Sequence, residues 1–223
     1  EYVISYEAGY RFTGSRSTTR LTLFHSRRSS QQVELSTQQD AGDPSSFVYF
    51  TNNAGGGWIE GLELEQQLRP SPSWTLSASV GLLASHIDAY SFQTAQGASV
   101  RLGDRAAAHA PSYNARIGLR YVSPAGAFVD TEMTRMDEFF YSDSHDQRSE
   151  SYRLVHAGLG LEREAWSIRL WGRNLLDERY GTRGFFFGLE PPDYGERLYV
   201  SYGDPRQVGV TLTAHPGELI DGR

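Results

Sequence analysis

The sequence of 223 residues contains no cysteine and no lysine, so all 21 of its basic residues are arginine. Without cysteine, the chain can form no disulfide and offers neither a thiolate metal ligand nor a thiol nucleophile. Acidic residues outnumber basic ones, and the formal net charge is -6. A nucleic-acid-binding protein would need a basic face, and this charge balance therefore argues against nucleic acid as a partner.

Long hydrophobic runs are also missing. Hydrophobic residues make up 39% of the chain, and the mean hydropathy is -0.49. No run approaches the roughly 18 apolar residues that identify a transmembrane helix, which excludes a helical membrane protein. The same composition is compatible with a membrane β-barrel, whose strands are apolar at only every second position.

What the sequence does contain is alternation with a period of two residues. In WTLSASVGLLA, which begins at Trp74, apolar residues alternate with serine, threonine and glycine; in LELEQQL, which begins at Leu62, leucine alternates with glutamate and glutamine. This period indicates β-strands, and no segment shows a convincing helical period. The pattern predicts nine strands, at 2–12, 18–35, 47–69, 74–89, 109–122, 127–141, 149–163, 165–176 and 205–214.

Short and long connections alternate between these strands. The short ones are TGSRS, PSPS, SPAG and the turn around Glu164, and the long ones are 36–46, 90–108, 142–148 and 177–204. An outer-membrane barrel has short periplasmic turns and longer external loops, with aromatic belts at both membrane interfaces. The belts are predicted from Tyr10, Phe12, Trp74, Tyr121 and Trp166 beside the short turns, and from Tyr90, Phe92, Phe139, Phe140 and Tyr141 beside the long loops.

The odd number of predicted strands places the two ends of the chain on opposite sides of a membrane. Complete bacterial barrels have an even number of strands, and a bilayer does not tolerate the unpaired edges of an open sheet. We therefore expect the chain to form the C-terminal part of a larger barrel.

The most distinctive segment is WSIRLWGRNLLDERYG, from Trp166 to Gly181, which is followed by GDPR at the start of the last predicted strand. This pairing of motifs resembles the end of the barrel in TonB-dependent outer-membrane receptors. The resemblance covers residues 4–214 and includes SYEAGYR, FTNNAGGGWIEGLELE and APSYNARIGLRY. The motif residues are Asn174, Leu175, Asp177, Tyr180, Pro205 and Arg206.

The resemblance implies an all-β fold, an antiparallel transmembrane β-barrel of about 22 strands around a plugged lumen. Residues 1–214 would form its C-terminal portion, about the last nine strands, and residues 215–223 a C-terminal tail. The plug domain and the N-terminal strands cannot be found in this sequence. The last predicted strand ends at Ala214, whereas barrels of this family commonly end on an aromatic residue.

The family imports scarce nutrients across the outer membrane of Gram-negative bacteria, most often ferric siderophores and otherwise cobalamin, haem or carbohydrates. The TonB–ExbB–ExbD complex supplies the energy through a segment that precedes the plug domain. The resemblance thus implies a transport receptor embedded in outer-membrane lipid, with no enzyme activity, cofactor or metal site of its own. Two other classes stay open: a passive outer-membrane channel and a barrel-embedded enzyme.

The long connection 177–204 is the best candidate for contact with a ligand. Its aromatic rings and guanidinium groups suit a flat anionic ligand such as an iron–catecholate complex, through stacking and charge-assisted hydrogen bonds. The alternative is a loop that packs its aromatic residues on itself and on its neighbours. The candidate residues are Arg183, Phe185, Phe186, Phe187, Tyr194, Arg197 and Tyr199.

Two further groups of residues have structural interpretations. The row Arg169, Trp171 and Arg173 would face the lumen, where a contact with the plug domain is favoured over a substrate role. Asn174 and Asp177 can stop a strand by bonding to nearby backbone, which favours a structural over a catalytic role. The six histidines are scattered without a metal-binding spacing.

Overall fold

The structure is a computed structural model that describes residues 1–40, 42–93, 97, 99–188 and 190–214. Its main element is a nine-stranded sheet in the order β1-β2-β3-β4-β7-β8-β9-β10-β13, with every neighbouring pair antiparallel. The nine predicted strands are therefore confirmed, while the predicted C-terminal tail 215–223 lies outside the described residues. The strands are β1 Tyr2–Thr13, β2 Ser17–Gln38, β3 Phe47–Ser71, β4 Trp74–Ile87, β7 Tyr113–Val122, β8 Ala127–Met136, β9 Tyr152–Glu162, β10 Trp166–Arg173 and β13 Gln207–Ala214.

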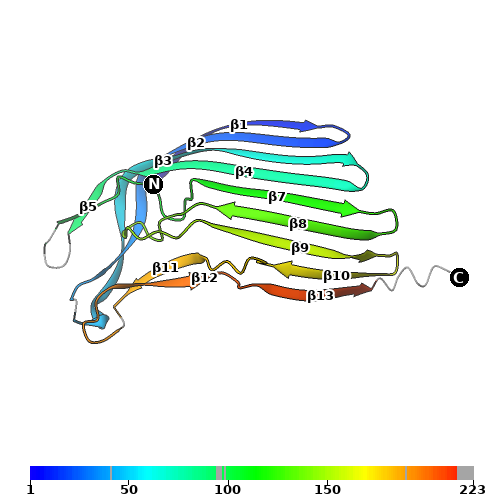
Figure 1. Ribbon diagram of the computed structural model, residues 1–223. Coiled ribbons are helices and arrows are strands. Elements are labelled where there is room, and N and C mark those ends of the chain that lie inside the picture. Colours follow the sequence, from blue (N-terminus) through cyan, green and yellow to red (C-terminus); the bar gives the residue numbers. More distant parts are fainter. Residues whose placement is uncertain (41, 94–96, 98, 189, 215–223) are drawn as a thin grey trace.

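The sheet is an open arc. Figure 1 shows the strands side by side in a curved sheet, with the tight turns at one end and the long connections at the other. The tight turns join β1 to β2, β3 to β4, β7 to β8 and β9 to β10. Because β1 and β13 each pair with one neighbour only, the barrel is not closed within the described residues.

The strand register sorts the side chains onto two faces. Side chains alternate along a strand, and residues directly opposite in neighbouring strands share a face. The apolar face carries pairs such as Leu76 and Leu119, and the polar face carries pairs such as Arg120 and Asp130. An exposed apolar surface of this extent marks a membrane or protein contact. Its exposed side chains include Leu82, Ile117, Val129, Met133, Leu159, Leu170, Val208, Val210 and Leu212.

The two predicted aromatic belts have different outcomes. At the short turns, the rings of Trp74 and Tyr121 lie 4.7 Å apart, and Trp166 is exposed. At the other end, the aromatic residues 139–141 are buried, because β8 ends at Met136 and the following chain folds under the long loops. Tyr90 is also buried, within the connection after β4. The assignment of these four residues to a belt is therefore wrong: burying a large apolar ring is favourable, and here the loops themselves provide the cover.

The long connections contain structure that the alternation does not predict. The connection after β4 holds a hairpin of β5 Tyr90–Gln93 and β6 Ser99–Leu102, and the connection after β10 holds one of β11 Gly181–Phe187 and β12 Arg197–Tyr202. A 3₁₀ turn, η1 Pro44–Ser46, precedes β3. Among the described residues, no helix has the length and apolar character needed to cross a membrane.

Asn174 clamps the end of β10 to the start of β13. Its side chain is 2% exposed, and its Nδ2 donates to the carbonyls of Glu178 at 2.9 Å and Asp204 at 3.0 Å. Its Oδ1 accepts from the amide of Glu178 at 2.9 Å. Nearby, the amide of Arg206 donates to Asp177 Oδ1 at 3.0 Å. The motif therefore ends one strand and positions the next, as the structural interpretation predicts.

Replacing Asn174 by alanine should lower the free energy of unfolding by about 2 kcal/mol, because three partly buried hydrogen bonds to backbone groups are lost. The left-handed backbone of this residue, with φ of 46°, adds to the cost because asparagine tolerates it better than alanine. Urea unfolding followed by tryptophan fluorescence would measure the change. Asn114→Ala, at an exposed position of β7, is the matched control and should change the midpoint little. Equal effects of the two substitutions would contradict the clamp.

Candidate functional site

Ion pairs connect the strands across the polar face. Asp130 on β8 accepts from Arg169 at 2.8 Å and lies 3.5 Å from Arg120, which also contacts Glu162 at 2.7 Å. Exposed pairs of this kind contribute little to stability, but together they fix the orientation of the guanidinium groups. The same face carries the pairs Arg20–Glu65 and Arg116–Glu132.

The predicted inward row Arg169, Trp171 and Arg173 lies on this polar face. The three residues line one hollow of about 560 Å³ together with Asp130 and His156. The indole of Trp171 donates to Thr211 Oγ1 at 3.1 Å, and the Arg173 guanidinium lies 5.3 Å from the Trp171 ring. The structure thus brings the row together as one polar surface, and its contact with a plug domain stays a prediction.

The β11–β12 hairpin is held in place by Phe186. This ring is 7% exposed and packs in a cluster with Phe139 and Tyr141. The His145 ring stacks on it with centroids 3.6 Å apart, and His145 Nε2 lies 3.1 Å from Glu196 Oε1. Phe186 therefore joins the hairpin to the connection between β8 and β9, and in this arrangement its ring is covered.

Other candidate residues of this connection are engaged by their neighbours. Arg197 lies 3.1 Å from both Glu190 and Asp193, and backbone hydrogen bonds together with Arg197 lower the pKa of the Asp193 carboxyl. The carbonyl of Tyr194 accepts from Gln38 Nε2 at 2.7 Å. Among the candidate residues, Arg183 and Phe185 are exposed, and the Phe185 ring is 42% exposed. These two side chains are therefore the best placed to meet a ligand.

Aromatic residues of three connections meet at one hollow. It has a volume of about 300 Å³, and Tyr49 at the start of β3 adds a further ring to it. The sequence pattern anticipates only the phenylalanines of this hollow, since its other residues stand in separate segments with no shared motif. Its rings and one carboxylate come from Tyr49, His109, Tyr141, Asp143, Phe185, Phe186 and Phe187.

Burial also changes the chemistry of Tyr90, at the start of β5. The ring packs beside Ile87, and its hydroxyl has no hydrogen-bond partner among the described residues. Desolvation, followed by the nearby charge of Asp143, raises the pKa of Tyr90 to about 12. Burial likewise raises the pKa of Tyr141. Both hydroxyls therefore stay neutral at physiological pH, and this part of the loops offers aromatic surface and no negative phenolate.

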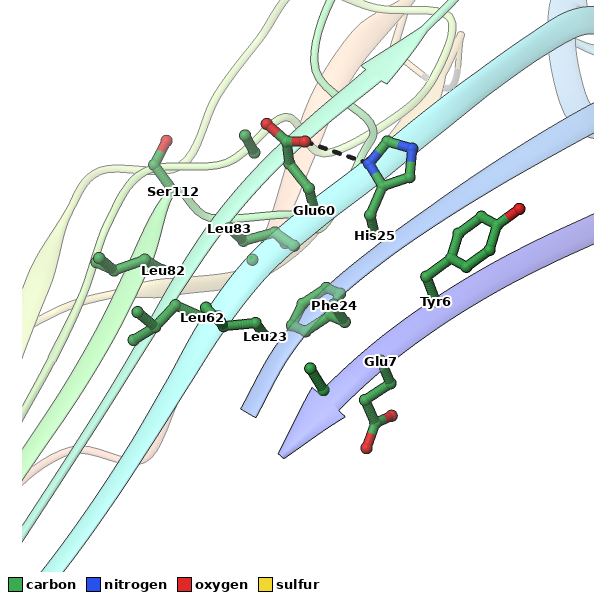
Figure 2. A pocket seen from close by; sticks show the side chains of 13 residues that line it. Tyr6, Glu7, Leu23, Phe24, His25, Glu60, Leu62, Leu82, Leu83 and Ser112 are labelled. Atoms are coloured by element: carbon green, nitrogen blue, oxygen red, sulfur yellow. Dashed lines mark hydrogen bonds and ion pairs between the residues drawn. The ribbon is translucent and has the colours of Figure 1, made fainter. Parts of the chain in front are cut away.

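A hollow of about 680 Å³ lies over β1–β4, and most of its walls belong to the apolar face. Figure 2 shows Leu23, Leu62 and Leu82 side by side on neighbouring strands, and beyond them the joined side chains of His25 and Glu60. His25 Nδ1 lies 3.2 Å from Glu60 Oε2. The apolar surface therefore ends at a polar pair on the side of the long connections.

No group of three or more histidine, cysteine, aspartate or glutamate residues that could hold a metal ion occurs in the described part of the chain. The long connections present aromatic rings that can stack and side chains that can form hydrogen bonds.

The family model described as TonB dependent receptor-like, beta-barrel matches residues 1–175. This is well over half of the sequence, so the chain belongs to the TonB-dependent receptor β-barrel family. The membership agrees with the resemblance carried by the Asn174 and Asp177 motif at the end of β10.

Solved structures of two receptors and a transporter share the fold over 94% of this chain. The ferric yersiniabactin uptake receptor FyuA from Yersinia pestis is 19% identical, with a TM-score of 0.70 and 29% of its own length covered. The siderophore receptor PiuA from Acinetobacter baumannii is 15% identical, with a TM-score of 0.69 and 27% covered. The copper transporter OprC is 12% identical, with a TM-score of 0.70 and 30% covered. The chain thus spans less than a third of the length of these proteins.

Replacing Phe186 by alanine should destabilise the β11–β12 hairpin by about 3–5 kcal/mol, because a buried ring leaves a cavity. Amide hydrogen exchange of residues 181–202 would measure the local opening. Phe185→Ala is the matched control one residue away, since its exposed ring should cost under about 1 kcal/mol. Similar exchange rates in the two variants would show that Phe186 does not anchor the hairpin.

Proposed function

We propose that this chain forms the C-terminal wall of an outer-membrane receptor that takes up a ferric siderophore, driven by the TonB–ExbB–ExbD complex. The observation that carries the proposal is the open antiparallel sheet with one apolar and one polar face, which shares its fold with receptor barrels over 94% of the chain. In the intact receptor, the apolar face meets outer-membrane lipid and the polar face meets the lumen.

The two free edges support a barrel completed by further strands. β1 and β13 expose unpaired backbone groups at the two ends of the arc. Backbone groups inside a bilayer need hydrogen-bond partners, and only a closed sheet supplies them to every strand. The remaining strands and a plug domain are therefore proposed as partners, with the plug resting against the ion pairs of Asp130 and the row Arg169, Trp171 and Arg173.

The long connections support ligand capture on the external side. The exposed side chains of Arg183 and Phe185 project from β11, next to the aromatic hollow that Tyr49 and His109 also line. A guanidinium and aromatic faces together suit a ligand that is both flat and negatively charged. This combination favours the chelated iron of a catecholate siderophore over a neutral carbohydrate.

Growth of a gene-deletion strain on defined iron sources tests the proposal. The strain should fail on one ferric siderophore and recover when the complete receptor is restored. The recovery should be lost again when TonB is deleted, because the imported ligand is too large for passive flow through a plugged barrel. Uptake that survives the loss of TonB would instead indicate a passive channel, and normal growth of the deletion strain on every siderophore would argue against the iron ligand.

Substitutions in β11 test the ligand site itself. Arg183→Ala and Phe185→Ala should each weaken binding of the ferric siderophore about tenfold, since a single good contact contributes roughly that factor. Arg69→Ala, an exposed arginine at the short-turn end of β3, is the matched control. Binding measured on whole cells with radioactive iron should be unchanged in the control. If all three variants bind as the parent does, the ligand site lies elsewhere.

A further inference from the structure

Arginines on the two faces of the sheet have different surroundings. On the polar face, Arg20 and Arg116 each contact a carboxylate on a neighbouring strand, and Arg169 of β10 reaches across β9 to Asp130 of β8. On the apolar face, Arg135 of β8 and Arg153 of β9 are both exposed, and neither forms an ion pair within the described residues. Arg135 and Arg153 therefore carry two positive charges with no ion-pair partner among the described residues.

The register places these two charges side by side. Arg135 is the direct antiparallel partner of Arg153, so both side chains leave the sheet on the same face at neighbouring positions. Like charges directly opposite in a sheet destabilise the pairing. An external anion between the two guanidinium groups would relieve this repulsion.

The pair also lies at a defined height on the wall. Arg135 is the second-last residue of β8 and Arg153 is the second residue of β9, at the end of the strands that leads into a long connection. The next partners on the same face are Met133 and Val155, followed further along by Val129 and Leu159. The apolar surface thus begins directly beside the arginines.

An aromatic ring stands beside the pair. The Arg135 guanidinium lies 5.8 Å from the ring centroid of Tyr113, on the neighbouring strand β7. Tyrosine with an adjacent cation is typical of the interface where lipid headgroups meet the hydrocarbon core. The three residues together present a cationic and aromatic surface immediately above hydrocarbon-facing side chains.

We propose that Arg135 and Arg153 bind the phosphate of a lipid headgroup in the leaflet on the side of the long connections. The guanidinium groups match phosphate oxygens through paired charge-assisted hydrogen bonds, and the acyl chains lie along Met133 and Val155. The site goes beyond ligand uptake, but it rests on the proposed placement of the chain in the outer membrane, whose outer leaflet carries phosphorylated glycolipid.

Binding of purified lipid A to the complete receptor in detergent micelles, measured by native mass spectrometry, tests the site. Lipid A is a phosphorylated diglucosamine lipid, and its dephosphorylated form removes only the charge. Arg135→Gln and Arg153→Gln should each weaken binding about fivefold, and the double variant about thirtyfold, since each basic residue at a lipid surface contributes about that factor. Arg69→Gln, at the opposite end of the strands, should bind lipid A as the parent does.

Three results would overturn the lipid site. The first is equal binding of lipid A by the parent and the double variant, and the second is equal binding of the phosphorylated and dephosphorylated lipids by the parent. The third is displacement of the lipid by inorganic phosphate at the same concentration, which would mark a site for a soluble anion.

Uptake in the same variants separates this site from the proposed function. The double variant should transport the ferric siderophore normally, because Arg135 and Arg153 face away from the lumen. Uptake absent from the parent, with lipid binding intact, would count against the transport function alone. A receptor that fractionates outside the outer membrane would overturn both.

Discussion

The backbone ladder of the nine-stranded sheet is the constraint on which the other features depend. Each strand is held by hydrogen bonds to both neighbours, except at β1 and β13, and this ladder fixes which side chains lie opposite one another. Because opposite residues share a face, Leu76 meets Leu119 on one side, while Arg120 meets Asp130 on the other. The separation of an apolar and a polar surface is therefore a consequence of register and not of any single contact.

The same constraint explains how much the sequence predicts. All nine wall strands follow from alternation, since a wall with different media on its two sides requires a period of two. The loop hairpins escape prediction because their strands are short and are held by tertiary contacts, such as Phe186 stacked on His145. The run Phe139–Tyr141 looks like the end of a strand, yet it is buried by loops that approach from elsewhere in the chain. Of the candidate site, the polar row on β10 follows from alternation, whereas Tyr49 and His109 reach the aromatic hollow by tertiary folding alone.

Charge placement separates the functions of the two surfaces. On the polar face, Asp130 and its partners neutralise one another in the absence of any ligand, so this wall offers an ordered, nearly balanced surface. On the apolar face, Arg135 and Arg153 stand together without such partners. All basic residues of the chain are arginine. On the polar face arginines form ion pairs between strands, whereas on the apolar face Arg135 and Arg153 have no ion-pair partner among the described residues. The difference arises from whether a carboxylate lies within reach of the guanidinium group on the same face.

The hydrogen bond between Gln38 and Tyr194 joins two hairpins that belong to distant parts of the arc. β2 and β3 lie near one edge of the sheet, whereas β11 and β12 leave the wall between its last two strands, and Figure 1 shows the two hairpin tips close together. This hydrogen bond holds the two hairpin tips together across the concave side of the arc. It therefore connects the β2–β3 and β11–β12 hairpins directly, although the strands of the two hairpins do not pair with each other.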